Sequence, residues 1–146
     1  MRSFLTPSVG MRESVRRGAV VALGTAAASL GIFAAPAQAA SWESYLDSVG
    51  PNFESRRWYQ GSAAAGTKIQ FTGCTGGNVA NVTLYKDIPY LPDPRYTMAA
   101  FTNCYNSSTA VSTGNWNDHG AADYYFVINE GAAEVYLSVR KVKVTY

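Results

Sequence analysis

Few side chains in this sequence could perform acid–base or nucleophilic chemistry. His119 is the only histidine, and it follows Asp118 in a stretch rich in Asn, Asp and Gly. A histidine beside an aspartate in such a stretch is typical of a turn, and no G-x-S-x-G motif supplies a nucleophile for a Ser-His-Asp arrangement. Asn115, Asn117 and Gly120 mimic the front of a calcium loop, but the leading acid and the closing Glu are absent. We therefore expect no enzyme, no metal site and no cofactor.

The two cysteines carry the clearest chemical signal. Cys74 and Cys104 are the only ones in the chain, and neither has a basic neighbour that would activate a thiolate. In an exported chain, which meets an oxidising environment, one intramolecular disulfide is the expected outcome. Closing a loop of about 30 residues stabilises a fold by roughly 3.5 kcal/mol on the chain-entropy account.

An export signal occupies the first part of the chain. An uncharged run rich in Ala, Val and Leu follows a group of arginines: Arg12, Arg16 and Arg17. Residues 37–39 read Ala-Gln-Ala, which completes the pattern of a cleavable secretory signal rather than a permanent membrane span. We expect residues 1–39 to be a signal peptide, with residues 1–10 as an over-long start, and the mature protein to be secreted and extracellular.

Removal of the signal changes the charge balance. Four of the twelve Lys and Arg residues and one of the ten acidic residues lie in residues 1–39, which leaves eight positive and nine negative side chains. A near-neutral chain lacks the basic stripe that binds nucleic acid or an anionic membrane. The mature length of roughly 107 residues suits one domain with one modest core.

The chain beyond residue 66 alternates apolar and polar residues with the period of a β-strand. Strands are predicted over residues 68–73, 79–86, 96–104, 124–128 and 135–146, with a weaker one over 108–112. Pro89, Pro92 and Pro94 exclude a central strand between Ile88 and Arg95, and residues 114–120 are predicted to form a polar loop. Six or so short strands predict a small antiparallel β-sandwich, immunoglobulin-like in the loose sense.

The last predicted strand contains a phase slip. Its apolar residues fall into two sets of opposite parity: Val135, Leu137 and Val139, then Val142, Val144 and Tyr146. A slip of one residue turns the apolar set outward unless a β-bulge or a bend absorbs it. We therefore predict an irregularity at Arg140 and Lys141, with Leu137 and Val144 both buried.

The segment 40–66 differs in composition, because it mixes aromatic residues and charges with a Gly50-Pro51 break and ends in a Gly/Ala spacer. Aromatic residues and Arg are enriched at interface anchors, and an extended segment can add a strand to a partner or lie in a cleft. We predict an N-terminal extended arm and spacer over 40–66, followed by a β-sandwich domain over 67–146. The predicted partner-binding residues are Trp42, Tyr45, Phe53, Arg56, Arg57 and Trp58. One alternative stays open, in which Phe53 to Tyr59 is the first core strand.

Several segments together resemble small secreted proteins of filamentous actinobacteria: the leader, residues 49–58, the Phe-Thr-x-Cys segments 71–74 and 101–104, and the closing Leu-Ser-Val strand. More narrowly, the chain resembles the small B subunit, or adaptor, of umbrella toxin particles. The resemblance implies a β-sandwich whose N-terminal extension bridges a repeat-bearing, stalked toxin subunit to a subunit that pairs a trypsin-like domain with a lectin. It carries over the arm and no other residue.

The residues and the resemblance both favour a secreted, non-catalytic interaction module, expected to be an adaptor whose partners are other secreted proteins. Arg56 and Arg57, between aromatic residues, would suit the cleft of a trypsin-like partner. A small secreted protease inhibitor would present a similar segment as a rigid loop. A carbohydrate-binding module would instead stack sugars on Trp116 and nearby tyrosines. A small hydrolase is the enzyme alternative.

Overall fold

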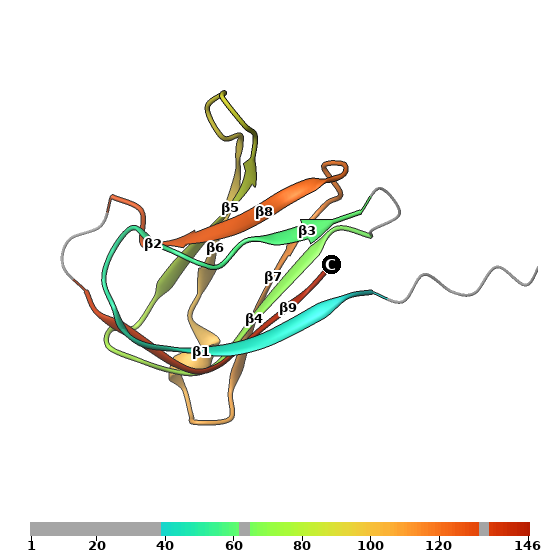
Figure 1. Cartoon of the computed structure of the whole chain (residues 1–146). Helices are drawn as coiled ribbons and strands as arrows, with labels where there is room; N and C mark the ends of the chain where they lie inside the picture. Colours follow the sequence, from blue (N-terminus) through green and yellow to red (C-terminus); the bar gives the residue numbers. More distant parts are fainter. Residues whose placement is uncertain (1–38, 62–64, 132–134) are drawn as a thin grey trace, which may run out of the picture. The chain divides into compact units, whose positions relative to one another are not determined.

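Residues 39–61, 65–131 and 135–146 are described by the computed structural model, and they form two antiparallel sheets that share one core (Figure 1). Within these ranges the only helical element is a short 3-10 turn, η1 (Asn103–Tyr105), and no helix is long and apolar enough to cross a membrane. The predicted signal peptide, with its over-long start, lies outside the described residues except for Ala39.

Nine strands build the described part of the fold. The four-stranded sheet has the order β1 (Ser41–Val49), β9 (Leu137–Thr145), β4 (Thr67–Thr75) and β7 (Val111–Trp116). The five-stranded sheet has the order β2 (Phe53–Glu54), β8 (Ala122–Ile128), β5 (Ala80–Asp87) and β6 (Arg95–Phe101), and β3 (Trp58–Gln60) also pairs with β8. The predicted all-β antiparallel sandwich is confirmed.

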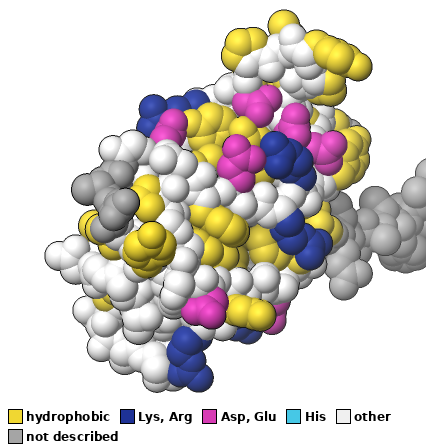
Figure 2. All heavy atoms as spheres, turned by 60° about the vertical axis from the view of Figure 1, so that its left-hand side comes forward, with side chains coloured by type: hydrophobic (Ala, Val, Ile, Leu, Met, Phe, Trp, Pro, Cys, Tyr) yellow, Lys and Arg dark blue, Asp and Glu magenta, His cyan; other side chains and the backbone are white. Residues whose placement is uncertain are grey.

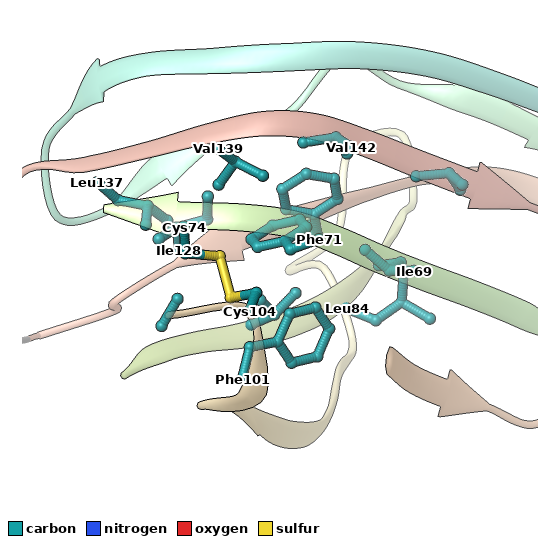
Figure 3. Packing of buried hydrophobic residues seen from close by; sticks show 14 of the residues in the cluster. Ile69, Phe71, Cys74, Leu84, Phe101, Cys104, Ile128, Leu137, Val139 and Val142 are labelled. Carbon is teal, nitrogen blue, oxygen red and sulfur yellow. A yellow bond between two sulfur atoms is a disulfide. The ribbon is translucent and has the colours of Figure 1, made fainter. Parts of the chain in front are cut away.

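Buried apolar side chains from the two sheets meet in one core, part of which is seen in Figure 3. Phe71 of β4 meets Phe101 of β6 edge-on, with ring centroids 4.9 Å apart. Ile69 and Leu84 are fully buried on the same inner faces. Burying an aliphatic or aromatic side chain of this size contributes about 1.5–3 kcal/mol, so this contact between the sheets supplies much of the stability.

The predicted disulfide is confirmed. Cys74 on β4 is bonded to Cys104 in η1, and their Cα atoms are 5.1 Å apart (Figure 3). The Cys104 backbone N–H also donates to Ser112 Oγ on β7 at 2.8 Å. The bond therefore ties the segment that follows β6 to the four-stranded sheet.

The phase slip in β9 is absorbed by a bend. Leu137 and Val144 are both fully buried, as predicted. The pairing of β9 with β4 skips the position where Arg140 faces Gly73, whose φ of 64° is in the left-handed region, and it keeps the same register on both sides. The compensating register shifts occur on the other side of β9, in its pairing with β1 after Ser44. Gly73 allows the bend because glycine adopts positive φ without steric cost.

The prediction of a polar loop over 114–120 is wrong at its start, because β7 continues to Trp116. Along β7 the buried positions are Ser112, Gly114 and Trp116, so the inward face is mostly small and polar. Gly114 is required there, since a Cβ atom would lie 2.5 Å from the Trp116 ring and 2.9 Å from the Phe101 ring. A hydrophobic pattern does not reveal a strand whose inward residues are small.

The segment predicted as a free arm belongs to the sandwich. Strand β1 pairs with β9, while β2 and β3 pair with β8. The Gly50-Pro51 break lies where the chain passes from one sheet to the other, between β1 and β2. Residues 41–60 therefore form part of the domain, and the boundary predicted at residue 66 is wrong. The alternative, in which Phe53 to Tyr59 is the first core strand, is correct only in part: the segment joins the sandwich and buries Trp58, but β1 precedes it, it forms the two short strands β2 and β3, and Tyr59 is exposed.

Candidate partner-binding surface

The residues predicted to bind a partner divide into a buried set and an exposed set. Trp42 and Trp58 are both buried, with ring centroids 5.9 Å apart, and both rings pack near Phe126 of β8. They are core residues, so their predicted role as partner anchors is wrong. Phe53 is half-buried and packs against the core. Tyr45 is 70% exposed on β1, which leaves it available to a partner.

Arg56 and Arg57 are exposed, but both are engaged within the chain. The Arg56 guanidinium lies 4.9 Å from the ring centroid of Trp42 and covers it. Arg57 forms ion pairs with Asp87 and Glu54, and its hydrogen bond to Asp87 raises the pKa of the guanidinium. A partner that used either arginine as a charged anchor would first have to displace these contacts.

A row of aromatic and charged side chains crosses the outer face of the five-stranded sheet. Tyr85 and Tyr125 stack with ring centroids 5.3 Å apart. The Tyr85 hydroxyl donates to Glu130 at 2.7 Å, and Glu130 also pairs with Arg95 at 3.1 Å. Burial, reinforced by a hydrogen bond to Asp93, raises the pKa of Tyr125 far above its usual value. These rings stay neutral at physiological pH, and stacking and hydrogen bonds hold them in place.

The β5–β6 loop, residues 88–94, stands on this row and is braced by one carboxylate. Asp93 accepts the Ile88 backbone N–H at 2.9 Å with one oxygen and the Tyr125 hydroxyl at 2.8 Å with the other. These two bonds, the backbone one first, lower the pKa of Asp93. At the base of the loop, the Lys86 N–H donates to the carbonyl of Pro94 at 3.1 Å.

The tip of this loop projects beyond the sheets and carries apolar side chains. The loop is the one that extends furthest upward in Figure 1, and hydrophobic atoms cover the corresponding projection in Figure 2. Tyr90 is fully exposed, and Leu91 is 65% exposed. Sequence reasoning used the prolines of this loop only to exclude a strand. An adjacent Tyr-Leu pair enclosed by Pro89 and Pro92 was the signal that it missed.

The loop that contains the only histidine has no acid–base pair between His119 and Asp118. The His119 ring stacks on Tyr96, with centroids 3.6 Å apart and planes 6° apart. Asp118 accepts hydrogen bonds from Gln60 at 3.0 Å and from the Gly120 N–H at 2.9 Å, so it closes a turn. Among the residues that the structure describes, no group of three His, Cys, Asp or Glu side chains is placed to hold a metal ion.

Trp116, the residue on which a sugar-stacking function would depend, is buried in the described structure. Its indole N–H donates to the Thr97 carbonyl of β6 at 2.6 Å. The ring therefore closes the gap between β7 and β6 and offers no open face to a sugar.

Comparison with known proteins gave no match to a protein-family model, to a curated protein or to a solved structure. The function is therefore inferred from the residues and geometry of this chain.

Proposed function

We propose that this protein is a secreted, non-catalytic interaction module. In its finer form the proposal is an adaptor subunit of an extracellular antibacterial toxin particle, which links a toxin-bearing subunit to a subunit with trypsin-like and lectin domains. The resemblance of the sequence to the umbrella toxin B subunit supports the finer form. The single observation that carries the general form is the braced β5–β6 loop with its exposed apolar tip.

This loop has the properties of a protein-binding element. Exposed aromatic side chains on rigid supports are typical interface anchors, because they bury a large area while losing little conformational entropy. Tyr90 and Leu91 are exposed side by side in sequence, whereas the loop backbone is fixed by Asp93. Of the segment predicted to bind a partner, only Tyr45, exposed on the edge strand β1, remains a candidate contact in this proposal.

Native co-purification tests the proposal. The tagged protein is recovered from the culture supernatant of the organism that produces it and is then separated by size. We expect a defined particle that contains two further secreted proteins, one of them with a trypsin-like domain. Elution of the protein alone, at the mass of a single mature chain, would contradict the proposal.

A secreted protease inhibitor is the second candidate, because a rigid exposed loop is also what an inhibitor needs. One feature disfavours it. The Leu91 N–H donates to the Ile88 carbonyl at 3.3 Å, so the tip is a tight turn, whereas protease clefts pair with extended backbone. Nanomolar inhibition of a serine protease by the purified protein would establish this second function. Full protease activity at micromolar protein would exclude it for the enzymes assayed.

A further inference from the structure

We propose that Tyr90 is the anchor of a pre-formed binding loop and inserts its ring into an apolar pocket of a partner protein through a largely uncharged contact. The inference rests on the proposed interaction function and names the surface and the kind of partner. It follows from the backbone of Tyr90, the exposure of its ring and the pairing of the charges around it.

The backbone at Tyr90 does not favour tyrosine. Its φ is 66°, and it is the third residue of a turn closed by the bond from Leu91 to Ile88, with Pro89 second. Turns with Pro second and a positive φ third favour Gly or Asn at that third position, because a Cβ atom with a bulky substituent is strained there. Tyr90 therefore costs the fold stability that Asn or Gly would restore.

The Tyr90 ring contributes little to the stability of the fold. Tyr90 is fully exposed, so its ring gains no burial within the described part of the chain. A large apolar ring that is both strained and open to water is characteristic of a functional position, since such strain clusters at binding sites. The interaction that offsets it must come from outside the described part of the chain.

The loop is built to bind without reorganisation. Asp93 binds Ile88, the first residue of the loop, and also holds the loop over Tyr125. Three prolines, Pro89, Pro92 and Pro94, further restrict the loop backbone. A pre-organised loop loses less entropy on association than a flexible one. A protein pocket is the matching partner, because Leu91 beside the ring adds apolar area rather than the hydrogen bonds that a sugar requires.

The charged side chains around the loop already have ion-pair or hydrogen-bond partners within the chain. The pairs are Arg57 with Asp87 and Glu54, Arg95 with Glu130, Asp93 with Ile88 and Tyr125, and Lys86 with the His119 carbonyl. Among the described residues around the loop, Lys86 is the one cation outside an ion pair, and a backbone carbonyl holds it. No cluster of free cations is therefore placed there to bind anionic headgroups, which disfavours a membrane. The contact is expected to depend weakly on salt, because screening weakens charge pairs far more than apolar burial.

Substitution separates binding from folding. Tyr90→Asn should raise the melting temperature by about 4 °C, because it relieves the strained turn. The same variant should lose the partner by at least 30-fold in a quantitative co-purification from culture supernatant. Tyr59→Asn is the matched control, since Tyr59 is an exposed tyrosine on β3, and it should keep full assembly. A Tyr90→Asn variant that assembles as well as the wild type would overturn the inference.

A photo-crosslinking residue identifies the class of partner. It is placed at position 90, or at position 59 as the control, in the full-length secreted protein, and the probe is the producing organism's own supernatant. A single protein crosslinked from position 90 alone, with the same yield when the irradiation is done at 50 and at 500 mM NaCl, supports the inference. Crosslinking to lipid or polysaccharide, the same pattern from position 59, or a tenfold loss at high salt overturns it.

The two proposals fail in different ways. If the wild type assembles and Tyr90→Asn assembles equally well, the interaction function stands and the anchor lies elsewhere. If the wild type is recovered alone, both proposals are contradicted.

Discussion

Strands β1–β3 and the β5–β6 loop both place aromatic residues beside charges, but they use them in opposite ways. In the first region Trp42 and Trp58 turn inward and join the core, and Arg56 covers the Trp42 ring. In the second region Tyr90 points away from the fold on a strained backbone. The same residue types therefore stabilise the fold in one place and are available for binding in the other. The direction of the side chain, not its type, decides between these roles.

The largest effect of a single substitution is expected at the inward aromatics. Trp58→Ala should lower the free energy of unfolding by about 3–5 kcal/mol, because a buried tryptophan leaves a cavity between the sheets. Its exposed neighbour supplies the control, since Tyr59→Ala should change stability by less than about 0.5 kcal/mol. Urea denaturation of the purified protein measures both. Equal, small effects would mean that β3 contributes nothing to the core.

Deletion of residues 41–53 sharpens the same point. It removes β1 and Trp42, so we expect a protein without a cooperative unfolding transition. A free arm would instead leave a folded domain. A truncated protein that melts cooperatively near the wild-type temperature would contradict the placement of this segment in the sandwich.

The disulfide tests whether the two regions depend on one core. Cys104→Ala combined with Cys74→Ala should cost roughly 3.5 kcal/mol on the chain-entropy account. Because the bond joins the segment that follows β6 to β4, we expect fluorescence of the inward tryptophans and far-UV circular dichroism to lose their signals in a single transition at a lower temperature. Two separated transitions would show that the sheets unfold independently.

Loss of the Asp93 brace should loosen the β5–β6 loop without unfolding the core. The hydrogen bonds to Asp93 lower its pKa in the folded protein, so the folded state favours the carboxylate. This stabilisation is fully present above the unfolded pKa of about 3.9, and it is lost as the pH falls through the lower folded-state value. Asp93→Asn should reproduce the acid behaviour at neutral pH, at a cost of about 1 kcal/mol.

Hydrogen exchange of the backbone amides around Ile88 and Leu91 measures the brace directly. Asp123→Asn, an exposed carboxylate on β8, is the control. Unchanged exchange in Asp93→Asn would show that the prolines alone hold the loop.

The smallest effect is expected at Arg57. Its ion pairs are exposed, and such pairs contribute about 0–1 kcal/mol, so Arg57→Ala should barely change the urea midpoint. It should also leave assembly intact, whereas a charged anchor in a partner's cleft would make it essential. If Arg57→Ala abolished particle assembly while stability was unchanged, the partner would bind at strands β1–β3 rather than at the β5–β6 loop.

Sequence patterns located the strands where one face is continuously apolar. Ile69 and Phe71 alternate with more exposed residues as expected and lie on β4, and the run from Tyr124 to Ile128 forms β8, where all five residues are buried. The disulfide was predicted from two cysteines in a chain that is expected to be exported. The edge strand β1 was missed because its pairing is bulged and Trp42 is its one buried residue, so it has no regular alternation to detect.

The sequence alone determined the all-β class, the cysteine pair and the bend in β9, because each depends on local residue order: alternation, cysteine count and a change of parity. Only the tertiary structure decided which aromatics face inward, because Trp42 and Trp58 are buried by strands distant in sequence, chiefly β8 and β9. It also decided that Tyr90 is an exposed, strained tip. The hydrogen bond between Asp93 and Tyr125 holds the loop over the sheet. These two residues are far apart in sequence, so no local pattern predicts their contact.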